Sequence, residues 1–337
     1  MGFSYMTYDN LISLQNLFQA YSEFRKGKKK RLDLQIFERN LEDNLFALHL
    51  SLKVKTYHHG KYEEFFINDP KRRHIHKAPV ADRVVHHLLY KYLYQVFDKS
   101  FIYDSNSCRI GKGTHKGVKR LDAFARKVSK NYSRDCFALK LDIKKFFARV
   151  DHQTLISLLK KRIKDKDIIW LLTEVINSFQ TENRKGIPLG NLTSQIFANI
   201  YLNQLDQFVK HVLKVKYYIR YADDFIILDS NQEALNRYTC ILAKFLKEKL
   251  KLDLHPQKVN IRKFSWGIDF LGYVVLPFYI LPRRKTKRRI LRKIKSRIQA
   301  YQNKQISDYS LNQTIQSYLG HLSHANTYKF RQKLLQQ

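Results

Sequence analysis

Cysteine is scarce in this chain of 337 residues, and nothing in its spacing ties the cysteines together. The three that occur lack the pattern of a disulfide framework or of a thiolate zinc site: Cys108, Cys136 and Cys240. The thirteen histidines show no His-Glu-x-x-His sequence, and adjacent pairs are expected to face solvent or backbone: His58-His59 and His86-His87. We therefore expect a reducing compartment and assign no metal to the histidines.

Long apolar runs are also missing. The longest, residues 270–281, is too short to cross a bilayer and contains Pro277. The start of the chain lacks the basic residues and the apolar stretch of a secretion signal. These absences predict a cytoplasmic protein without a membrane partner.

Acidic residues are few, because 29 Asp and Glu stand against 63 Lys and Arg, for a formal charge of +34. Such a surplus, spread along the chain and not confined to one tail, is typical of a protein that binds polyphosphate. Nucleic acid is the expected partner. Charge alone leaves open a ribosomal or chromatin-like binding protein that does no chemistry.

The sequence does contain a clear succession of helical and extended patterns. Residues 11–50 and 86–94 carry apolar side chains at helical spacing, and residues 57–77 between them are predicted to be extended and basic. Residues 136–143 alternate as a strand does. This pattern places Asp142 near the end of a strand.

Two acidic residues are predicted to share the tip of a hairpin. Residues 217–221 and 225–228 read as strands with a tight connection that contains Asp223 and Asp224. Adjacent carboxylates amid apolar residues are costly to desolvate unless a cation pairs with them. Magnesium prefers such oxygen ligands, and Asp142 beside the tip would complete a two-metal clamp. A lysine partner and a solvated Asx-type turn are the alternatives.

Three segments, in order along the chain, contain these acids or lie between them. They resemble motifs A, B and C of the reverse transcriptases: Leu139-Lys-Leu-Asp-Ile-Lys-Lys-Phe-Phe147, residues 186–203, and Tyr221-Ala-Asp-Asp224. Four further segments are similar to the two finger motifs and to motifs D and E of that family: residues 73–83, 107–112, 252–258 and 270–273. The resemblance implies an α+β protein with the right-hand polymerase fold, which has fingers, a palm with an antiparallel sheet and a helical thumb.

The resemblance also implies a division of the chain. We expect N-terminal helices and fingers over residues 1–135, with parts that return to the palm, and a palm with motifs A to E over residues 136–276. A basic helical thumb is expected over residues 277–337. Within it the basic run 283–297 predicts a helix with one packed face: Ile290, Ile294, Ile298 and Tyr301.

The family's chemistry implies a role for each acid. Asp142 and Asp223 would bind two Mg²⁺ ions, with Asp224 assisting and Ile143 among the metal ligands. Deoxynucleoside triphosphates, a template RNA and a primer or its cDNA are the implied substrates. Lys258 resembles the motif D lysine that protonates pyrophosphate, and a plain surface lysine is the alternative.

Nucleotide selection is implied for a second group of residues. Arg73 and Lys77 match finger positions that contact the triphosphate, and for Lys77 a solvated basic residue is an equal alternative. Phe147 matches the steric gate that leaves no space for a ribose 2′-hydroxyl, whereas Phe146 is expected to pack in the core.

Motif B departs from the usual family pattern. Leu189 stands where many relatives place glutamine, and Gly190 is followed by Ser194-Gln195, a form that resembles the reverse transcriptases of diversity-generating retroelements. That resemblance implies a bacterial or phage-encoded, error-prone enzyme that miscopies template adenines. A small basic oligomeric accessory protein is its expected partner. Leu189, Gly190 and Gln195 would lie at the nucleotide.

Two other functions are left open. One is a retron-like or phage-defence reverse transcriptase. The other is an RNA-binding protein of polymerase fold that does not catalyse, which the three intact aspartates argue against.

Contacts to primer and template are expected from seven residues: Tyr221, Arg109, Lys112, Gly272, Lys287, Lys293 and Arg297. Tyr221 would touch the primer end, although a tyrosine is also ordinary in a half-buried strand. The last three are expected to be exposed members of the basic run, whose cations outnumber what intramolecular pairing can use.

Overall fold

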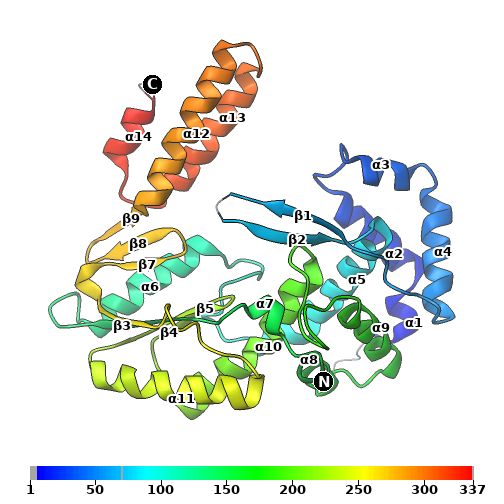
Figure 1. The fold of residues 1–337 in the computed structure, drawn as a ribbon, viewed down its shortest axis with the longest axis horizontal. Helices are drawn as coiled ribbons and strands as arrows, with labels where there is room; N and C mark the ends of the chain where they lie inside the picture. The colour runs from blue at the N-terminus through cyan, green and yellow to red at the C-terminus, as the bar shows by residue number, and fades with distance from the viewer. Residues whose placement is uncertain (1–5, 70, 336–337) are drawn as a thin grey trace. The chain divides into compact units, whose positions relative to one another are not determined.

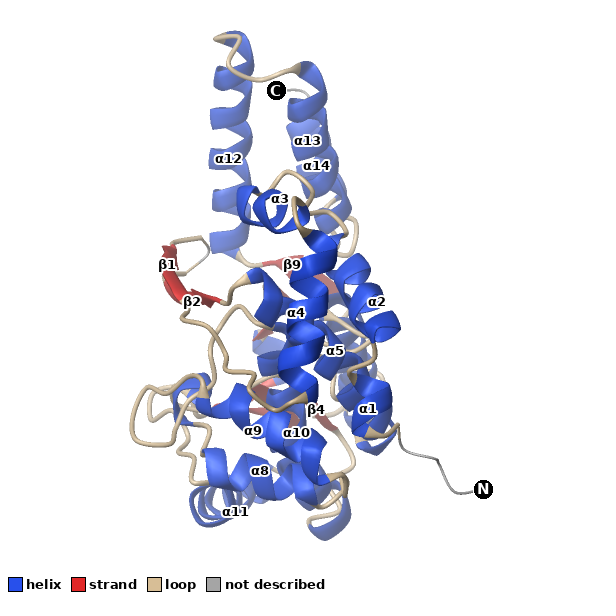
Figure 2. Ribbon diagram, turned by 90° about the vertical axis from the view of Figure 1, so that its right-hand side faces the viewer, coloured by secondary structure: helices blue, strands red, loops and turns tan. Residues whose placement is uncertain are grey.

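A computed structural model describes residues 6–69 and 71–335 of the chain (Figure 1). The chain divides into two compact units, each assembled from three separate segments. Unit 1 comprises residues 1–103, 143–214 and 242–256, and unit 2 comprises residues 104–142, 215–241 and 257–337. Helices and antiparallel sheets occur together, which confirms the predicted α+β class (Figure 2).

Unit 1 is mostly helical. Its helices are α1 (Tyr8–Leu11), α2 (Leu14–Arg25), α3 (Leu32–Glu38), α4 (Leu41–Lys53), α5 (Val80–Phe97), α7 (Phe146–Arg149), α8 (His152–Lys160), α9 (Lys166–Asn177) and α10 (Leu192–Gln207), with short turns of other helix types at η1 (Asp98–Ser100) and η2 (Phe208–Val212). Several helices follow an N-cap residue whose side chain accepts a backbone N–H of the first turn. These residues are Ser13 before α2, Asp151 before α8 and Asp165 before α9. The helices predicted near residues 11–50 and 86–94 are confirmed.

A two-stranded antiparallel hairpin completes unit 1. Strand β1 (Glu63–Ile67) pairs with β2 (Arg73–Lys77), which confirms the predicted extended segment. The register places Glu64 opposite His76 and Phe66 opposite His74. Because side chains alternate along a strand, these four share one face of the hairpin, and Arg73 and Lys77 lie on the other.

A four-stranded antiparallel sheet organises unit 2. It contains β3 (Phe137–Asp142), β4 (Tyr218–Tyr221), β5 (Asp224–Asp229) and β6 (Asn260–Lys263), in the order β4-β5-β3-β6. In β5 the run Phe225 to Leu228 is buried on both faces of the sheet. A fully apolar run of this kind is what a strand covered on both faces requires.

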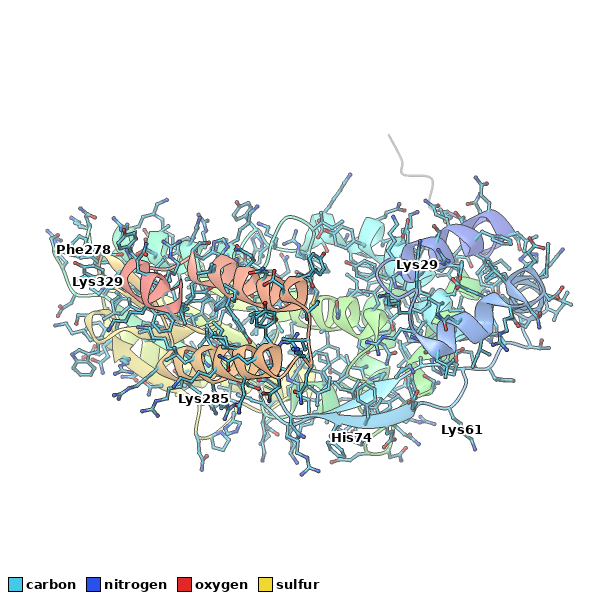
Figure 3. All side chains as sticks on the ribbon, turned by 90° about the horizontal axis from the view of Figure 1, so that it is seen from above. Lys29, Lys61, His74, Phe278, Lys285 and Lys329 are labelled. Atoms are coloured by element: carbon cyan, nitrogen blue, oxygen red, sulfur yellow. The ribbon has the colours of Figure 1, made fainter. Side chains whose placement is uncertain are left out.

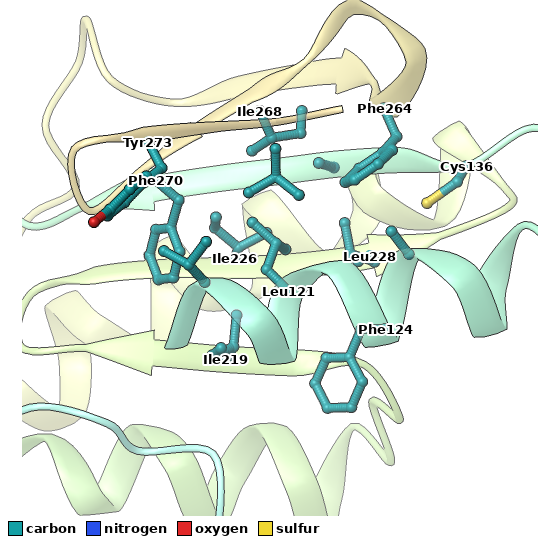
Figure 4. Close-up of a cluster of buried hydrophobic side chains, with 14 residues drawn as sticks. Leu121, Phe124, Cys136, Ile219, Ile226, Leu228, Phe264, Ile268, Phe270 and Tyr273 are labelled. Atoms are coloured by element: carbon teal, nitrogen blue, oxygen red, sulfur yellow. The ribbon is translucent and has the colours of Figure 1, made fainter. Parts of the chain in front are cut away.

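A second, smaller sheet closes the core of unit 2. Its strands are β7 (Ile268–Phe270), β8 (Tyr273–Leu276) and β9 (Tyr279–Pro282), preceded by a short 3₁₀ turn at η3 (Phe264–Trp266). Helix α6 (Thr114–Val128) supplies Leu121 and Phe124 to the same cluster as Ile226 and Phe270 (Figure 4). The core therefore joins one helix to both sheets.

Three further helices lie at the C-terminal end of unit 2: α12 (Arg284–Gln302), α13 (Asp308–Leu322) and α14 (Tyr328–Leu335). Their shared core includes Ile290, Ile294 and Leu322. The predicted apolar face of α12 is confirmed except at Tyr301, which is 42% exposed because it lies in the last turn of the helix. Helix α11 (Gln232–Leu250) begins in unit 2 and ends in unit 1.

No helix in the described ranges is long and apolar enough to cross a membrane.

Candidate active site

The predicted acidic hairpin forms next to the strand that ends at Asp142. Ala222 and Asp223 connect β4 to β5, and the pairing of Tyr221 with Asp224 closes the turn. Ala222 has φ +52°, a left-handed conformation typical of two-residue hairpin turns. Asp142 is the direct partner of Asp224 across the β3–β5 ladder. Opposed residues have Cβ atoms roughly 4.5–5.5 Å apart, so folding gathers these carboxylates beside the turn that carries Asp223.

The environment of Asp224 suits a cation. Its Oδ1 atom is shielded from solvent and has no hydrogen-bond partner within the described chain, and its Oδ2 atom lies 3.3 Å from Lys140 Nζ. Burial raises the pKa of Asp224 to about 6; the Lys140 ammonium opposes the rise, and Asp142 and Asp223 add to it. An orphaned carboxylate oxygen beside two more carboxylates fits the hard-oxygen preference of magnesium.

Lys258 contacts the carboxylate of Asp142 directly. Its Nζ atom lies 2.9 Å from Oδ1 and 3.0 Å from Oδ2. The lysine side chain is 46% exposed, so its ammonium can leave the carboxylate without disturbing the core. A lysine partner, one of the alternatives for these acids, is thus present for Asp142 and, through Lys140, for Asp224.

Arg220 supports the acidic turn and was not anticipated from the sequence. It is fully buried, and its Nη1 atom donates to the carbonyl oxygen of Ala222 at 3.1 Å. Its Nη2 atom donates to Ser105 Oγ at 3.0 Å, and its backbone pairs with residues 104 and 106. A charged residue inside the apolar run 217–221 was the signal that could have drawn attention to it.

The loop that pairs with Arg220 contains two predicted template-contact residues. Arg109 donates from Nη1 to the carbonyl of Ser105 at 3.2 Å, which fixes the loop. Burial, followed by the charge of Arg109, lowers the pKa of Lys112. Tyr221 is half-buried and its hydroxyl accepts a hydrogen bond from Thr114 at 3.4 Å.

In unit 1 the motif B loop, residues 186–191 before α10, is hydrogen-bonded to strand β2. His76 donates its backbone N–H to the carbonyl of Leu189 at 2.9 Å, and the Asn191 side chain donates to the carbonyl of His76 at 2.8 Å. Gly190 has φ +114°, and a Cβ there would lie 2.8 Å from the Cγ2 of Ile75. Glycine is therefore required at this position by both conformation and space.

The two phenylalanines after motif A differ in burial. Phe146 is fully buried, as expected for a core residue, whereas Phe147 is half-buried and its carbonyl accepts the N–H of Ile187 at 2.8 Å. Gln195 is exposed in the first turn of α10.

The chain matches the family described as "Reverse transcriptase (RNA-dependent DNA polymerase)" over residues 68–275. The match takes in the three aspartates, Lys258 and the motif B loop. This chain belongs to the reverse transcriptase family.

Individual relatives agree with that assignment. An "Uncharacterized 91 kDa protein in cob intron" of Schizosaccharomyces pombe is 30% identical over 186 residues, which cover 50% of this chain and 22% of that protein. "Group II intron-encoded protein LtrA" of Lactococcus lactis subsp. cremoris is 24% identical, with 69% of this chain and 49% of that protein covered. This chain thus spans half or less of the length of these two relatives.

The fold is shared with a solved telomerase. The structure of apo telomerase from Candida tropicalis, truncated from its C-terminal domain, superposes with a TM-score of 0.52 at 14% identity. The overlap covers 71% of this chain and 60% of that one. The predicted right-hand polymerase fold is confirmed.

Arg73 and Lys77, the two residues expected to contact the triphosphate, have different surroundings. Arg73 is exposed at the start of β2. Lys77 is half-buried, with its Nζ atom 2.8 Å from Glu63 and 3.0 Å from Asp33. A triphosphate would have to compete with these two carboxylates for Lys77.

The basic helix α12 differs in part from prediction. Lys293 is exposed, but Lys287 is half-buried over the ring of Phe330, and Arg297 donates to Ser310 Oγ of α13 at 2.9 Å. The expectation that all three are exposed is wrong, because every third or fourth side chain of α12 turns toward its neighbours. The exposed cations include Lys285, which projects from α12 (Figure 3).

Gly272 lies in a turn between strands. Leu271 and Gly272 have φ +51° and +92° and join β7 to β8. The carbonyl of Gly272 accepts the N–H of Arg283 at 3.0 Å, so this turn adjoins the start of α12.

The paired histidines were expected to face solvent or backbone. His59 does contact backbone, since its Nδ1 atom lies 2.7 Å from the carbonyl oxygen of Gly60, whereas the expectation is wrong for His86. The Nε2 atoms of His59 and His86 lie 3.0 Å apart, and His86 Nδ1 lies 2.7 Å from Thr193 Oγ1. Both rings are buried, and burial lowers the pKa of His86 to about 3. Their partners come from distant segments of unit 1, which the local sequence pattern does not reveal.

Proposed function

We propose that this reverse transcriptase is an RNA-directed DNA polymerase that extends a primer along an RNA template with deoxynucleoside triphosphates. The observation that carries the proposal is the register of β3 and β5, which sets Asp142 opposite Asp224 beside the turn that holds Asp223. Primer, template and triphosphate are all polyanions, and the charge of +34 suits them.

Asp142 and Asp223 would hold divalent magnesium, with Asp224 and the Ile143 carbonyl as supporting ligands. When bound, the ions lower the pKa of the primer 3′-hydroxyl and neutralise the charge of the leaving pyrophosphate. Lys140 keeps the Asp224 carboxylate in place at 3.3 Å. Lys258, released from Asp142, carries a proton at Nζ that can pass to the pyrophosphate.

Residues of unit 1 would select the nucleotide. Arg73 is proposed to contact the triphosphate, with Lys77 in a second position, because each carries a cation on one face of β2. Phe147 is proposed as the gate that excludes a 2′-hydroxyl, and its half-buried ring suits contact with a sugar better than the buried Phe146 does. Leu189, Gly190 and Gln195 are proposed to line the nascent base pair.

The division into fingers, palm and thumb is part of the same proposal. Residues 1–135 would form the N-terminal helices and fingers, residues 136–276 the palm and residues 277–337 the thumb. The thumb would follow the duplex with the exposed cations of α12.

Primer extension by three single variants tests the polymerase proposal. Asp142→Asn and Asp223→Asn should fold and bind RNA yet lose extension by several orders of magnitude, because removal of a metal ligand removes several kcal/mol of charge stabilisation. Asp135→Asn is the matched control, since this carboxylate is exposed and pairs with Lys263 at the far end of β3. Extension by Asp223→Asn at the control's rate would refute the assignment.

We propose further that the enzyme belongs to a diversity-generating retroelement and works with a small basic oligomeric accessory protein. The support is the motif B sequence, with Leu189 before Gly190 and Ser194-Gln195 in the helix that follows. A group II intron-encoded enzyme is the second candidate, because the Lactococcus relative is described as such.

Two observations separate these candidates. A repeat pair near the gene that differs mainly at adenine positions supports the retroelement, and a flanking self-splicing intron supports the second candidate. The cDNA made from a defined RNA should carry most of its errors opposite adenine, and an even error spectrum in the presence of the natural partners rules the retroelement out.

A further inference from the structure

The β1–β2 hairpin carries a cluster of metal-ligating side chains that the polymerase chemistry does not use. Glu64 lies on β1, and His74 and His76 lie on β2. One ligand atom from each lies within 4.8 Å of the others. His74 Nε2 is 3.0 Å from Glu64 Oε2, and His76 Nε2 is 3.8 Å from Glu64 Oε1. One carboxylate thus lies between two imidazole nitrogens.

The backbone fixes this arrangement. His74 and His76 are two residues apart in one strand, so both rings point to the same face, and Glu64 is the direct cross-strand partner of His76. The opposite face of β2 carries Arg73 and Lys77, the cations proposed for the triphosphate. The cluster is therefore separate in position from those cations.

Neighbouring rings hold the two imidazoles. Phe66 stacks on His74 with ring centroids 4.5 Å apart, and Phe179 packs edge-on against His76 at 4.5 Å. His76 Nδ1 is buried and has no hydrogen-bond partner in the described chain, which leaves Nε2 as the atom that an ion can reach. Burial, followed by the charge of His74, lowers the pKa of His76 and keeps its lone pair available.

Two imidazoles and one carboxylate suit a different ion from the one proposed for the aspartates. Imidazole nitrogen favours zinc, copper and nickel, whereas magnesium prefers oxygen. Two histidines and a glutamate also form a common zinc ligand set that leaves one position for water. Glu64 is 57% exposed at its side chain, so an ion can enter from solvent.

We propose that Glu64, His74 and His76 bind one transition-metal ion of the zinc class and that this ion fastens β1 to β2. A two-stranded hairpin has little stability of its own, and a ligand from each strand adds a link across it. His76 also holds the motif B loop through its backbone, at Leu189 and Asn191. The ion therefore stiffens the segment on which that loop rests.

Titration of the untagged full chain with Co²⁺ tests the site, after removal of bound metal with a chelating resin. Visible absorption reports coordination by imidazole, and competition with Zn²⁺ gives the affinity. The wild type should bind one equivalent with the spectrum of a four-coordinate site. Mutation of a residue that only hydrogen-bonds a metal ligand typically costs about 10–100-fold in metal affinity. His74→Ala and Glu64→Gln each remove a direct ligand, so each should weaken binding on the order of a hundredfold or more.

His58→Ala is the matched control. His58 is exposed and pairs with Glu174 at 3.3 Å, so it reproduces a histidine–glutamate pair without a third ligand. Equal Co²⁺ affinity in the wild type and in His74→Ala, or no stoichiometric binding by the wild type, overturns the proposal. Because Glu64 is exposed, Glu64→Gln decides the question even where a histidine variant fails to fold.

Amide hydrogen exchange tests the mechanical part. Zn²⁺ should slow exchange over β1 and β2 in the wild type and leave His74→Ala unchanged. Equal exchange with and without Zn²⁺ in the wild type shows that the ion does not fasten the hairpin. Neither measurement depends on polymerase activity, so the metal proposal and the polymerase proposal can fail independently.

Discussion

Arg220 is the largest fully buried residue of the described chain, and it supports the turn that contains Asp223. Its guanidinium bridges the carbonyl of Ala222 and the hydroxyl of Ser105. The planar group can donate in two directions at once, whereas a lysine ammonium is a compact point charge on a flexible stem. A lysine at this position would keep the positive charge but not both hydrogen bonds, to Ala222 and to Ser105.

Arg220→Lys should lower the turnover number of primer extension by roughly 10- to 100-fold, because a displacement of about 1 Å at a reacting group can cost that much. The KM for nucleotide should change less, since no nucleotide contact is removed. Steady-state kinetics on a primed RNA measure both values. Arg126→Lys, at an exposed arginine of α6 that pairs with Asp122, is the control. An unchanged turnover number contradicts the role.

Phe147 tests the sugar gate. Phe147→Ala should raise ribonucleotide incorporation relative to deoxyribonucleotide, because the space closed by the ring opens to the 2′-hydroxyl. Competition between the two nucleotides in single-turnover extension measures the ratio. Phe278→Ala, at an exposed phenylalanine, should leave the ratio unchanged. The same ratio in both variants would return Phe147 to a packing role.

Substitution of Leu189 tests whether this residue limits the accuracy of cDNA synthesis. Glutamine has similar size and adds a side-chain hydrogen bond, which is worth roughly 0.5–1.5 kcal/mol net and about two- to twelve-fold in discrimination. Leu189→Gln should lower misincorporation by that factor, most visibly opposite template adenine. Sequencing of cDNA from one defined RNA measures it. Equal adenine error rates in the two enzymes would remove Leu189 from the fidelity argument.

Individual residues were predictable where the signal was local. Asp142 ends an alternating run and Asp223 lies between two apolar runs, so both were found from neighbours in sequence. Lys140 and Arg220 were missed, because their partners Asp224 and Ser105 lie more than eighty positions away and are reached only through sheet pairing. The pKa of Asp224 likewise depends on burial that no local pattern encodes.

Helix α12 shows how an element sorts its cations. Its buried face packs Ile290 and Ile294, and its exposed face carries Arg292, Lys293 and Lys295. An exposed face with more cations than local acids is suited to phosphate.

Replacement of Arg292, Lys293 and Lys295 by glutamine should weaken binding of an RNA–DNA duplex and flatten its salt dependence. The slope of log affinity against log salt should fall by about 0.9 for each phosphate that α12 no longer neutralises. Titrations at several salt concentrations measure the slope. Glutamine at three exposed lysines of unit 1 makes a control of equal charge change: Lys26, Lys29 and Lys30. Equal slopes in the two triple variants mean that α12 is not a phosphate clamp.

For helices and strands, the sequence predicted their presence better than it predicted which of their side chains are exposed. The period of the apolar residues predicts α12 and its core, but the exposure expected of Arg297 is wrong because its guanidinium reaches α13. Which partner covers a helix is set by chain segments far away in sequence, and periodicity carries no information about them.

Stability of the whole molecule should depend on pH through the buried histidines of unit 1. Burial lowers the pKa of His86 to about 3 and that of His87 to about 4, from an ordinary value of 6.5. Between these values the unfolded chain binds more protons than the folded chain, so the free energy of unfolding falls as the pH falls. The stabilisation is complete above pH 6.5 and is lost as the pH drops toward 3.

For His86 alone the decrease between pH 7 and pH 5 is about 2 kcal/mol, from 1.36 kcal/mol per pKa unit. His86→Asn should remove that share of the pH dependence, as measured by urea unfolding at the two pH values. His58→Asn, at an exposed ring, should leave it intact. A pH dependence that is the same in both variants contradicts the assignment to His86.

The division of the chain into units could not be read from the sequence. The linear boundaries at residues 135 and 276 remain a prediction about function, whereas each compact unit is built from three segments. The reason is visible in β3, whose neighbours β5 and β6 come from other segments of the chain. Basic residues recur throughout the chain, so they do not mark such crossings.

The position of β3 inside its sheet has a consequence for synthesis on the ribosome. Both of its neighbours are translated later, and β5 begins at Asp224, 82 residues after Asp142 ends β3. Translation adds roughly 5–20 residues per second, so the apolar strand waits about 4 to 16 seconds with two open edges. Open edges are templates for unwanted pairing with other chains. The open edges of β3 are thus exposed to such pairing while the motif B segment, residues 186–203, is being made.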